Sequence, residues 1–317
     1  MRAIIFDHYG PPGVLQWSER EKPRLGKHDV LVRVRATSVN PIDWKLRSGA
    51  MRWIMPQSFP KVLGFDVSGE IVAMGSHATA FAIGDEVFGM QEIARHGANA
   101  EFVAIRESAL ARKPSALSHE EAAALPLAGL TAMQALHAHA RTTASERVLV
   151  LGASGGVGAF AVQIAKACGA HVTGVCSRKN ERFVRELGAD EVSTYDTSDV
   201  SRTFDVVFDA VGLGSYFSCR RYLNERGRFV STIPSAKNAI AIAMLGVGRL
   251  FGNQKRAHMF LTKASGSDLA NLAALVTDAK LRVPLEGIYP LEDLGAAHAR
   301  SQTGRVTGKL AVLVASA

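Results

Sequence analysis

One glycine-rich stretch constrains the fold of this chain more than any other feature of its sequence. Residues 147–151 (R-V-L-V-L) form an apolar run typical of a buried strand, and Gly152, Gly155 and Gly158 follow in the spacing G-x-x-G-x-x-G. An amphipathic helix is expected at 157–168. In such a strand–loop–helix unit, one glycine permits the tight bend, one lets the backbone approach a pyrophosphate, and one lets helix and strand pack closely.

Strands and helices alternate after this loop. Strands are expected at 171–176 and 191–194, with a helix between them at about 180–187, and further strands at 206–210 and 228–232. Parallel strands joined by helices form an open, doubly wound sheet, the Rossmann type of α/β fold. The N–H groups at the start of a helix in such a sheet can hold phosphates. The sequence therefore predicts a dinucleotide-binding domain.

The end of the second strand of this sheet indicates which dinucleotide is bound. An acidic residue there would bind the ribose 2′-hydroxyl of NAD, whereas a basic residue would neutralise the 2′-phosphate of NADP. The chain has Ser177, Arg178 and a lysine at this place, and no carboxylate before Glu181. Arg178 can form a charge-assisted hydrogen bond with a phosphate, and Ser177 can donate its hydroxyl. We predict NADPH; the alternative is a solvated helix start without a ligand.

The chain before residue 110 is rich in short strands. They are expected at 30–36, 69–74, 86–90 and 101–105, and glycines punctuate them. Many short strands with glycine turns indicate a compact barrel-like or sandwich-like domain.

The pattern changes near Ser118, where S-H-E-E begins an alanine-rich helix with a polar cap and acidic residues in its first turn. The last expected strand, at 308–314, no longer fits the alternation of strands and helices, and we expect it to return to the first domain. We therefore predict one domain from residues 1–117 and 288–317 and a second from residues 118–287. A length of 317 residues suits two domains.

Composition and charge exclude several other classes of protein. The chain is 47% hydrophobic and 21% charged, as in globular proteins, so a disordered chain is excluded. Its three cysteines share no C-x-x-C spacing, which argues against a four-cysteine zinc lobe and a secreted disulfide framework. The net charge of +8 comes from scattered bases, so an anionic small ligand is expected rather than a nucleic acid.

No targeting or membrane segment is evident. The first apolar run is only four residues long and is followed by an acidic residue and a turn, which does not fit a signal peptide. No uncharged stretch approaches the ~20 residues of a membrane-spanning helix without glycine interruptions. The expectation is a soluble, cytoplasmic protein that does not enter a membrane.

Five segments in a fixed order resemble one known family. They are S-V-N-P-I-D-W-K at 38–45, L-G-F-D-V-S-G at 63–69, L-P-L-A-G-L-T-A at 125–132, the glycine loop, and G-K-L at 308–310. With them, essentially the whole chain resembles the zinc-independent quinone oxidoreductase branch of the medium-chain dehydrogenase/reductase superfamily. The resemblance implies a GroES-like β-barrel domain joined to a Rossmann domain with a doubly wound parallel sheet. It also implies a homodimer.

The resemblance assigns the cofactor contacts. They are Thr131, Ser154, Gly155, Gly156, Val157, Ser177, Arg178, Tyr195, Gly212, Ile233 and Lys309. Three of these residues have simpler interpretations. Thr131 could bond its own helix backbone, Tyr195 could be packed at a strand end, and Lys309 could be a solvated lysine.

The positions that match the zinc ligands of other family members carry Asn40, Phe65 and Ala128. Phe65 and Ala128 have no ligand atom, and a catalytic zinc takes three protein ligands. His137 and His139 are two residues apart on an expected helix, so they point to different faces. The sequence therefore predicts no metal site.

Without a Lewis acid, the expected hydride acceptor is one activated by conjugation, namely a quinone or an α,β-unsaturated carbonyl compound. The resemblance implies that Asn40, Asp43 and Trp44 line the acceptor pocket. Asn40 is a candidate to orient the acceptor carbonyl, although Asn-Pro is also an ordinary turn starter. No residue is evident as proton donor, and solvent could supply the proton.

Two further interpretations stay open. The apolar, glycine-broken segment 240–256 could line the acceptor pocket, form a dimer contact or be a buried helix, and an edge strand near 229–233 could pair across the dimer. The alternative function is a non-enzymatic NADPH-binding sensor, or a nucleic-acid-binding protein, with the same fold.

Overall fold

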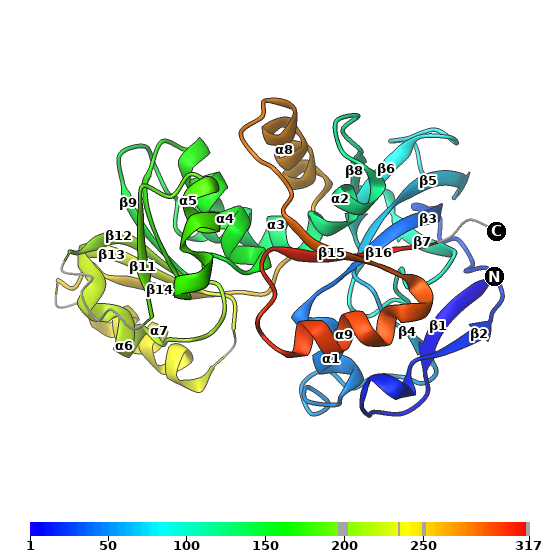
Figure 1. The fold of residues 1–317 in the computed structure, drawn as a ribbon, viewed down its shortest axis with the longest axis horizontal. Coiled ribbons are helices and arrows are strands. Elements are labelled where there is room, and N and C mark those ends of the chain that lie inside the picture. Colours follow the sequence, from blue (N-terminus) through cyan, green and yellow to red (C-terminus); the bar gives the residue numbers. More distant parts are fainter. Residues whose placement is uncertain (196–201, 234, 249–251, 315–317) are drawn as a thin grey trace. The chain divides into compact units, whose positions relative to one another are not determined.

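The computed structural model describes residues 1–195, 202–233, 235–248 and 252–314, which belong to two compact units (Figure 1). The first unit comprises Met1–Leu130 and Lys263–Ala317, and the second comprises Thr131–Thr262. In the part of the chain that the structure describes, no helix is long and apolar enough to cross a membrane.

The larger sheet of the first unit has seven strands. They are β3 (Asp29–Val39), β5 (Asp66–Met74), β6 (Glu86–Met90), β7 (Phe102–Arg106), β8 (Leu110–Arg112), β15 (Leu285–Pro290) and β16 (Lys309–Leu313). Within β3, Val30, Val32 and Val34 point into the main core of the unit, as the predicted alternation of apolar and basic residues requires. β16 pairs antiparallel with β3, with Leu310 opposite Val39. This pairing confirms that the last strand returns to the first domain.

A smaller sheet and several helices complete the first unit. The sheet has the order β2 (Gln16–Glu19), β1 (Arg2–Phe6), β4 (Lys61–Val62). The helices are α1 (Pro41–Arg47), α2 (His119–Ala124), α8 (Gly266–Thr277) and α9 (Leu294–Gln302). The side chain of Ser118 caps α2 by accepting a hydrogen bond from the Glu121 N–H, so this helix begins where its sequence predicted.

The two units divide the chain differently from the domains predicted at 1–117 with 288–317 and at 118–287. The division lies within α3 (Pro126–Met133), and the first unit includes α2 and α8. α2 packs on β3, β5 and β16, and α8 packs on β8, which explains why contacts group these helices with the first sheet. The predicted extent of the cofactor-binding domain stays a prediction.

The second unit contains a six-stranded, entirely parallel sheet with the order β11-β10-β9-β12-β13-β14. Its strands are β9 (Arg147–Leu151), β10 (His171–Cys176), β11 (Glu191–Thr194), β12 (Phe204–Asp209), β13 (Leu223–Ser231) and β14 (Arg256–Met259). This order, 3-2-1-4-5-6 when counted from β9, is that of a dinucleotide-binding Rossmann sheet. The order of the strands reverses between β9 and β12, which run parallel, and this places a binding crevice at the carboxyl ends of these strands.

Helices cover both faces of this sheet (Figure 1). They are α4 (Gly156–Ala167) and α5 (Glu181–Glu186) on one face, and α6 (Tyr216–Cys219) and α7 (Ala236–Gly248) on the other. Leu149, Val207 and Phe229 of the sheet form one core with Tyr216 and Leu245 from α6 and α7. A π-helical turn, Gln134–His139, continues α3 into the second unit.

The expected edge strand near 229–233 is wrong. β13 lies between β12 and β14, so its two sides are both paired, and β14 is the edge of the sheet. Strand β14 is hard to detect in the sequence, because R-A-H-M is short and not strongly apolar. Within the expected segment 240–256, the structure places α7 and the start of β14, and residues 249–251 lie outside the described residues.

Candidate cofactor and acceptor site

Three glycines of the loop between β9 and α4 satisfy three different steric requirements. Gly152 has a φ of +78°, which suits the tight bend that glycine allows. A Cβ atom at Gly158 would lie only 2.1 Å from the carbonyl oxygen of Gly152, so this glycine lets the helix pack against the strand. A Cβ atom at Gly155 would meet no protein atom closer than 3.5 Å, so the space above this residue is open. That open space fits the predicted approach of a pyrophosphate.

The start of α4 provides backbone N–H groups that can donate hydrogen bonds to a ligand. Gly155 is its N-cap residue and provides no side-chain acceptor, so side chains do not cap the first N–H groups of this helix of 12 residues. Uncapped N–H groups at the positive end of a helix dipole bind anions. Gly156 and Val157, predicted to face a pyrophosphate, are the first two residues of this helix.

The turn after β10 is joined to the glycine loop. Asn180 donates its amide to the hydroxyl of Ser154 at 2.9 Å, which holds the basic turn beside the loop. Arg178 is exposed and makes no hydrogen bond or ion pair with the residues that the structure describes. The nearest carboxylate in sequence, Glu181, pairs with Arg185 at 3.3 Å. The turn therefore carries the positive charge of Arg178, and no described carboxylate pairs with it.

Two more predicted contacts meet at the carboxyl ends of β12 and β13. Gly212 has a φ of +75°, and a Cβ atom there would lie 2.7 Å from Cγ1 of Ile233. The buried carboxylate of Asp209 holds this turn, because it accepts backbone N–H bonds from residues 211 to 214 at 2.8–3.2 Å. The sequence reasoning assigned no role to Asp209, although an acidic residue that ends a buried strand before V-G-L-G is a usable signal.

Tyr195 and Thr131 also belong to the second unit. Tyr195 follows β11 and is 50% exposed, so it is not the packed strand-end tyrosine of the simpler interpretation. Thr131 is buried, and its hydroxyl lies 2.7 Å from that of Thr262, which follows β14. Sequence reasoning did not single out Thr262, because its position beside Thr131 depends on the tertiary fold.

A buried polar cluster occupies the first unit. Lys309 donates to Oδ1 of Asn40 at 2.5 Å and lies 3.5 Å from Oδ2 of Asp66, while Asn40 donates its amide to the same Asp66 oxygen at 2.8 Å. All three residues are at most 3% exposed. Lys309 is therefore a buried residue with defined partners and not a solvated lysine.

Asp66 links several elements. Besides Asn40 and Lys309, it accepts hydrogen bonds from the hydroxyl of Ser38 at 2.5 Å and from the N–H of Leu127 at 2.7 Å. These bonds join β5 to β3 and to the start of α3. The negative charge of Asp66 is thus used within the unit, where it compensates the buried ammonium of Lys309.

Asp43 is fully buried beside this cluster and accepts the N–H groups of Asn40 at 2.8 Å and of Gly64 at 3.2 Å. Burial raises the pKa of Asp43 to about 7; repulsion from Asp66 also raises it, and the two N–H groups and Lys309 oppose the rise. Burial likewise lowers the pKa of Lys309, against the attraction of Asp66 and Asp43. The cluster can therefore hold or release a proton near neutral pH.

The three predicted acceptor-pocket residues differ in exposure. Asn40 and Asp43 are 2% and 0% exposed, and the Asn40 amide is already bonded to Asp66 and Lys309. Trp44, on α1, is half-buried, and its indole N–H has no hydrogen-bond partner among the described residues. Of the three side chains, Trp44 is therefore the one with a donor still to be satisfied.

The donor set does not fit a metal ion. Within the described ranges, no three or more histidine, cysteine, aspartate or glutamate side chains gather in a way that could hold one. Phe65 and Ala128 are buried and carry no ligand atom. His137 lies 3.0 Å from Cys168 Sγ, and His139 stacks on Phe260 with ring centroids 4.3 Å apart.

Comparison with known proteins decides the family. Residues 26–115 match the family described as alcohol dehydrogenase GroES-like domain, and residues 187–312 match the one described as zinc-binding dehydrogenase. The chain is 33% identical to the chloroplast envelope quinone oxidoreductase homolog of Arabidopsis thaliana, with 98% of each chain covered. The protein belongs to the medium-chain dehydrogenase/reductase superfamily, in its quinone oxidoreductase-like branch.

Other members of this superfamily agree with that placement. The bovine NAD(P)H oxidoreductase RTN4IP1, mitochondrial, is 33% identical and covers 99% of this chain, which covers 89% of that protein. The structure of the quinone oxidoreductase from Coxiella burnetii superposes with a TM-score of 0.90 at 35% identity, covering 99% of each chain. The predicted fold class, a GroES-like domain with a Rossmann-like parallel-sheet domain, is confirmed. The relatives support a nicotinamide-dependent oxidoreductase that acts on a small molecule.

Proposed function

We propose that this protein is an NADPH-dependent oxidoreductase that transfers hydride, without zinc, to a quinone or an α,β-unsaturated carbonyl compound. The observation that carries the proposal is the hydrogen bond from Asn180 to Ser154. It holds beside the glycine loop an exposed Arg178 that has no ion-pair partner among the described residues. A phosphate-binding loop beside an unpaired cation suits a dinucleotide with an additional phosphate.

The proposed cofactor contacts are those that the resemblance to the family implies. They are Thr131, Ser154, Gly155, Gly156, Val157, Ser177, Arg178, Tyr195, Gly212, Ile233 and Lys309. NADPH, when bound, would supply hydride from its nicotinamide. Ser177 and Arg178 would hold the 2′-phosphate, and the N–H groups at the start of α4 would hold the pyrophosphate. Lys309, whose ammonium is bonded inside the first unit, would act there by fixing Asn40 and Asp66.

The acceptor class is inferred from the donors that the first unit offers. Positions 65 and 128 provide no metal ligand, so a substrate that needs an alkoxide stabilised by zinc is a poor fit. A conjugated acceptor takes hydride at carbon and needs only a hydrogen-bond donor for the developing oxyanion. We assign this contact to Trp44, whose buried N–H has no hydrogen-bond partner among the described residues, and treat Asn40 and Asp43 as positioning residues. Solvent would protonate the product.

The direct test measures initial rates of NADPH and NADH oxidation with 9,10-phenanthrenequinone and with trans-2-hexenal. We expect turnover with NADPH and at least one of these acceptors. Tight NADPH binding without turnover of a broad panel of quinones and enones would overturn the proposal. It would favour the alternative of a non-enzymatic NADPH-binding protein, whose retardation of RNA could then be tested.

A single substitution tests the assignment of Trp44. Trp44→Phe keeps an aromatic ring but removes the indole N–H, so we expect kcat with the preferred acceptor to fall about tenfold, since one hydrogen bond to a developing charge is lost. The Kd of NADPH should not change. Trp17→Phe, which alters a 46%-exposed tryptophan elsewhere in the first unit, is the matched control. An unchanged kcat in Trp44→Phe would contradict the assignment.

The proposal includes a homodimer and a cytoplasmic location. Among the described residues, no strand pairs with the outer side of β14, and the neighbouring α7 exposes Ile240, Met244 and Val247. This region is therefore a better candidate for a subunit contact than β13. The three cysteines are free, as in proteins of reducing compartments. Light scattering coupled to size-exclusion chromatography measures the mass directly; the mass of a single 33.9 kDa chain would contradict the dimer.

A further inference from the structure

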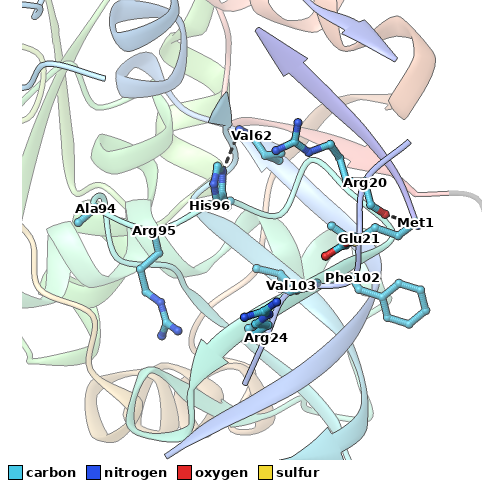
Figure 2. A pocket seen from close by; sticks show the side chains of 13 residues that line it. Met1, Arg20, Glu21, Arg24, Val62, Ala94, Arg95, His96, Phe102 and Val103 are labelled. Atoms are coloured by element: carbon cyan, nitrogen blue, oxygen red, sulfur yellow. Dashed lines mark hydrogen bonds between the residues drawn. The ribbon is translucent and has the colours of Figure 1, made fainter. Parts of the chain in front are cut away.

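A pocket of about 350 Å³ lies in the first unit, among residues that the proposed function does not use (Figure 2). Three segments form most of it, namely residues 20–24 after β2, residues 94–97 in the loop before β7, and residues 102–104 at the start of β7; Met1 and Val62 complete the lining. This volume is within the usual range for small-molecule sites. The pocket lies wholly within one compact unit.

Two arginines that line this pocket have no partner of their own. The guanidinium groups of Arg20 and Arg24 make no hydrogen bond or ion pair with any residue that the structure describes. Arg95 also lines the pocket, but it is paired with Asp29 through both of its terminal nitrogens. Glu21 contributes one carboxylate to the lining. In Figure 2 these side chains lie around the same hollow.

A buried lysine adds positive charge beside the pocket. Lys61 is 8% exposed, and its ammonium donates to the carbonyl oxygens of Ala94 at 3.3 Å and Arg95 at 2.6 Å. No carboxylate in the described part of the chain pairs with it. His96 lines the pocket and accepts the N–H of Val62 on its Nδ1 at 3.4 Å. Burial lowers the pKa of His96, and the charges of Lys61 and Arg20 lower it further. The potential around His96 is therefore positive.

We infer that this pocket binds a small organic phosphate monoester. The charges of Lys61 and Glu21 offset each other and Arg95 is paired with Asp29. Arg20 and Arg24 therefore face the phosphate together with the Met1 ammonium, which also lines the pocket and donates to the Arg20 carbonyl oxygen. Guanidinium groups are suited to phosphate because they present paired N–H donors. Val62 and Val103, which also line the pocket, provide apolar surface for the organic part of the ligand.

The test is a titration of the 317-residue protein with phenyl phosphate. Binding is measured by calorimetry and by the NMR resonances of the His96 ring. We expect one site with a submillimolar Kd and a shift of the His96 resonances. Phenol, which lacks the charge, should not bind, and inorganic phosphate, which lacks the ring, should bind at least tenfold more weakly. Arg20→Ala and Arg24→Ala should each weaken phenyl phosphate at least tenfold, whereas Glu21→Gln should tighten it.

Two control variants separate binding in this pocket from a general effect of surface charge and from binding at the cofactor site. Arg305→Ala removes one exposed positive charge from the same unit and should bind phenyl phosphate as the wild type does. Arg178→Ala removes the proposed 2′-phosphate contact and should leave the His96 response unchanged. Wild-type affinity in both Arg20→Ala and Arg24→Ala, or loss of binding in Arg178→Ala alone, would overturn the inference. None of these measurements depends on turnover or on NADPH.

Discussion

Asp43 shows how strongly the surroundings of one residue can change its chemistry. The side chain is fully buried and accepts two backbone N–H groups, yet burial and the neighbouring Asp66 raise its pKa from the ordinary value of 3.8 to about 7. Lys309, buried in the same cluster, supplies the compensating charge. A carboxyl group that titrates near neutral pH in a fixed hydrogen-bond network is typical of a functional site.

The raised pKa of Asp43 predicts a pH dependence of stability. Between about pH 4 and pH 7 the folded protein retains a proton that the unfolded chain releases, so Asp43 lowers the free energy of unfolding as pH rises through this window. A shift of about 3 pH units corresponds to about 4 kcal/mol. Asp43→Asn cannot titrate, so its stability relative to the wild type should improve by up to this amount between pH 4 and pH 8. Denaturant unfolding at each pH measures the difference, and parallel profiles for the two proteins would contradict the prediction.

Arg178 is the residue on which the cofactor preference is proposed to depend. Arg178→Ala should weaken NADPH binding by roughly 10- to 150-fold, because a charge-assisted hydrogen bond of roughly 1.5–3 kcal/mol is lost, and should leave NADH nearly unchanged. Fluorescence titration with each cofactor measures both affinities. Arg182→Ala, whose side chain is 92% exposed and paired with Glu186, is the matched control. Equal losses for NADPH and NADH would show that Arg178 does not contact the 2′-phosphate.

At the scale of elements, side chains hold short helices and turns in place. Arg47, at the end of α1, is fully buried and donates to His298 at 3.2 Å, to the carbonyl oxygen of Gly10 at 2.6 Å and to Gln302 at 3.0 Å. Burial lowers the pKa of His298 to about 3, with a contribution from Arg47, so the neutral ring can accept this bond. These contacts tie α1, which carries Trp44, to α9.

The glycine loop predicts opposite outcomes for two substitutions three residues apart. Gly155→Val should fold, since the backbone there is extended and a Cβ atom meets nothing closer than 3.5 Å, but its side chain should block the pyrophosphate and abolish binding of both cofactors. Gly158→Ala should destabilise the protein, because its Cβ atom would lie 2.1 Å from the Gly152 carbonyl oxygen. Circular dichroism and cofactor titration distinguish the two effects. Retained binding in a folded Gly155→Val would show that the loop is misassigned.

At the scale of the whole molecule, residues 187–312 match the family described as zinc-binding dehydrogenase, and we propose that this chain departs from zinc-dependent members by working without the metal. Phe65 and Ala128 are buried in the first unit, and neither side chain can coordinate a metal. The cluster of Asn40, Asp66 and Lys309 instead forms a self-compensated network of hydrogen bonds. A buried ammonium in such a cluster also opposes the binding of a cation.

Removal of metal tests this departure. We expect dialysis against EDTA, followed by 1,10-phenanthroline, to leave both the melting temperature and the rate of NADPH oxidation unchanged, because no side-chain trio among the described residues can hold a metal. Elemental analysis of the dialysed protein confirms that metal was removed. A loss of activity that added zinc restores would contradict zinc independence.

The sequence by itself determined the features that depend on neighbouring residues and on order along the chain. The spacing of Gly152, Gly155 and Gly158 predicted the strand–loop–helix unit, because the steric requirement that each glycine satisfies involves residues close to it in the sequence. The alternation of strands and helices predicted the parallel sheet. The residues from Ser177 to Glu181 predicted a basic turn after its second strand, and Arg178 is exposed in this turn. These features depend on residues that are close together in the sequence, so they can be predicted from the sequence alone.

The tertiary structure decided the features that depend on contacts between distant segments. Asn40 and Lys309 are 269 positions apart in the sequence, yet they form a hydrogen bond. The residue types alone suggested a substrate contact for Asn40 and a solvated position for Lys309, and only this bond shows that both belong to a buried cluster. The order of the strands likewise made β14 rather than β13 an edge of the sheet. The fold also brought Arg20 and Arg24 to the pocket beside Lys61. The exposure of a residue and its electrostatic environment depend on all residues that surround it in the fold. Many of these are distant in the sequence, so the local sequence does not predict them.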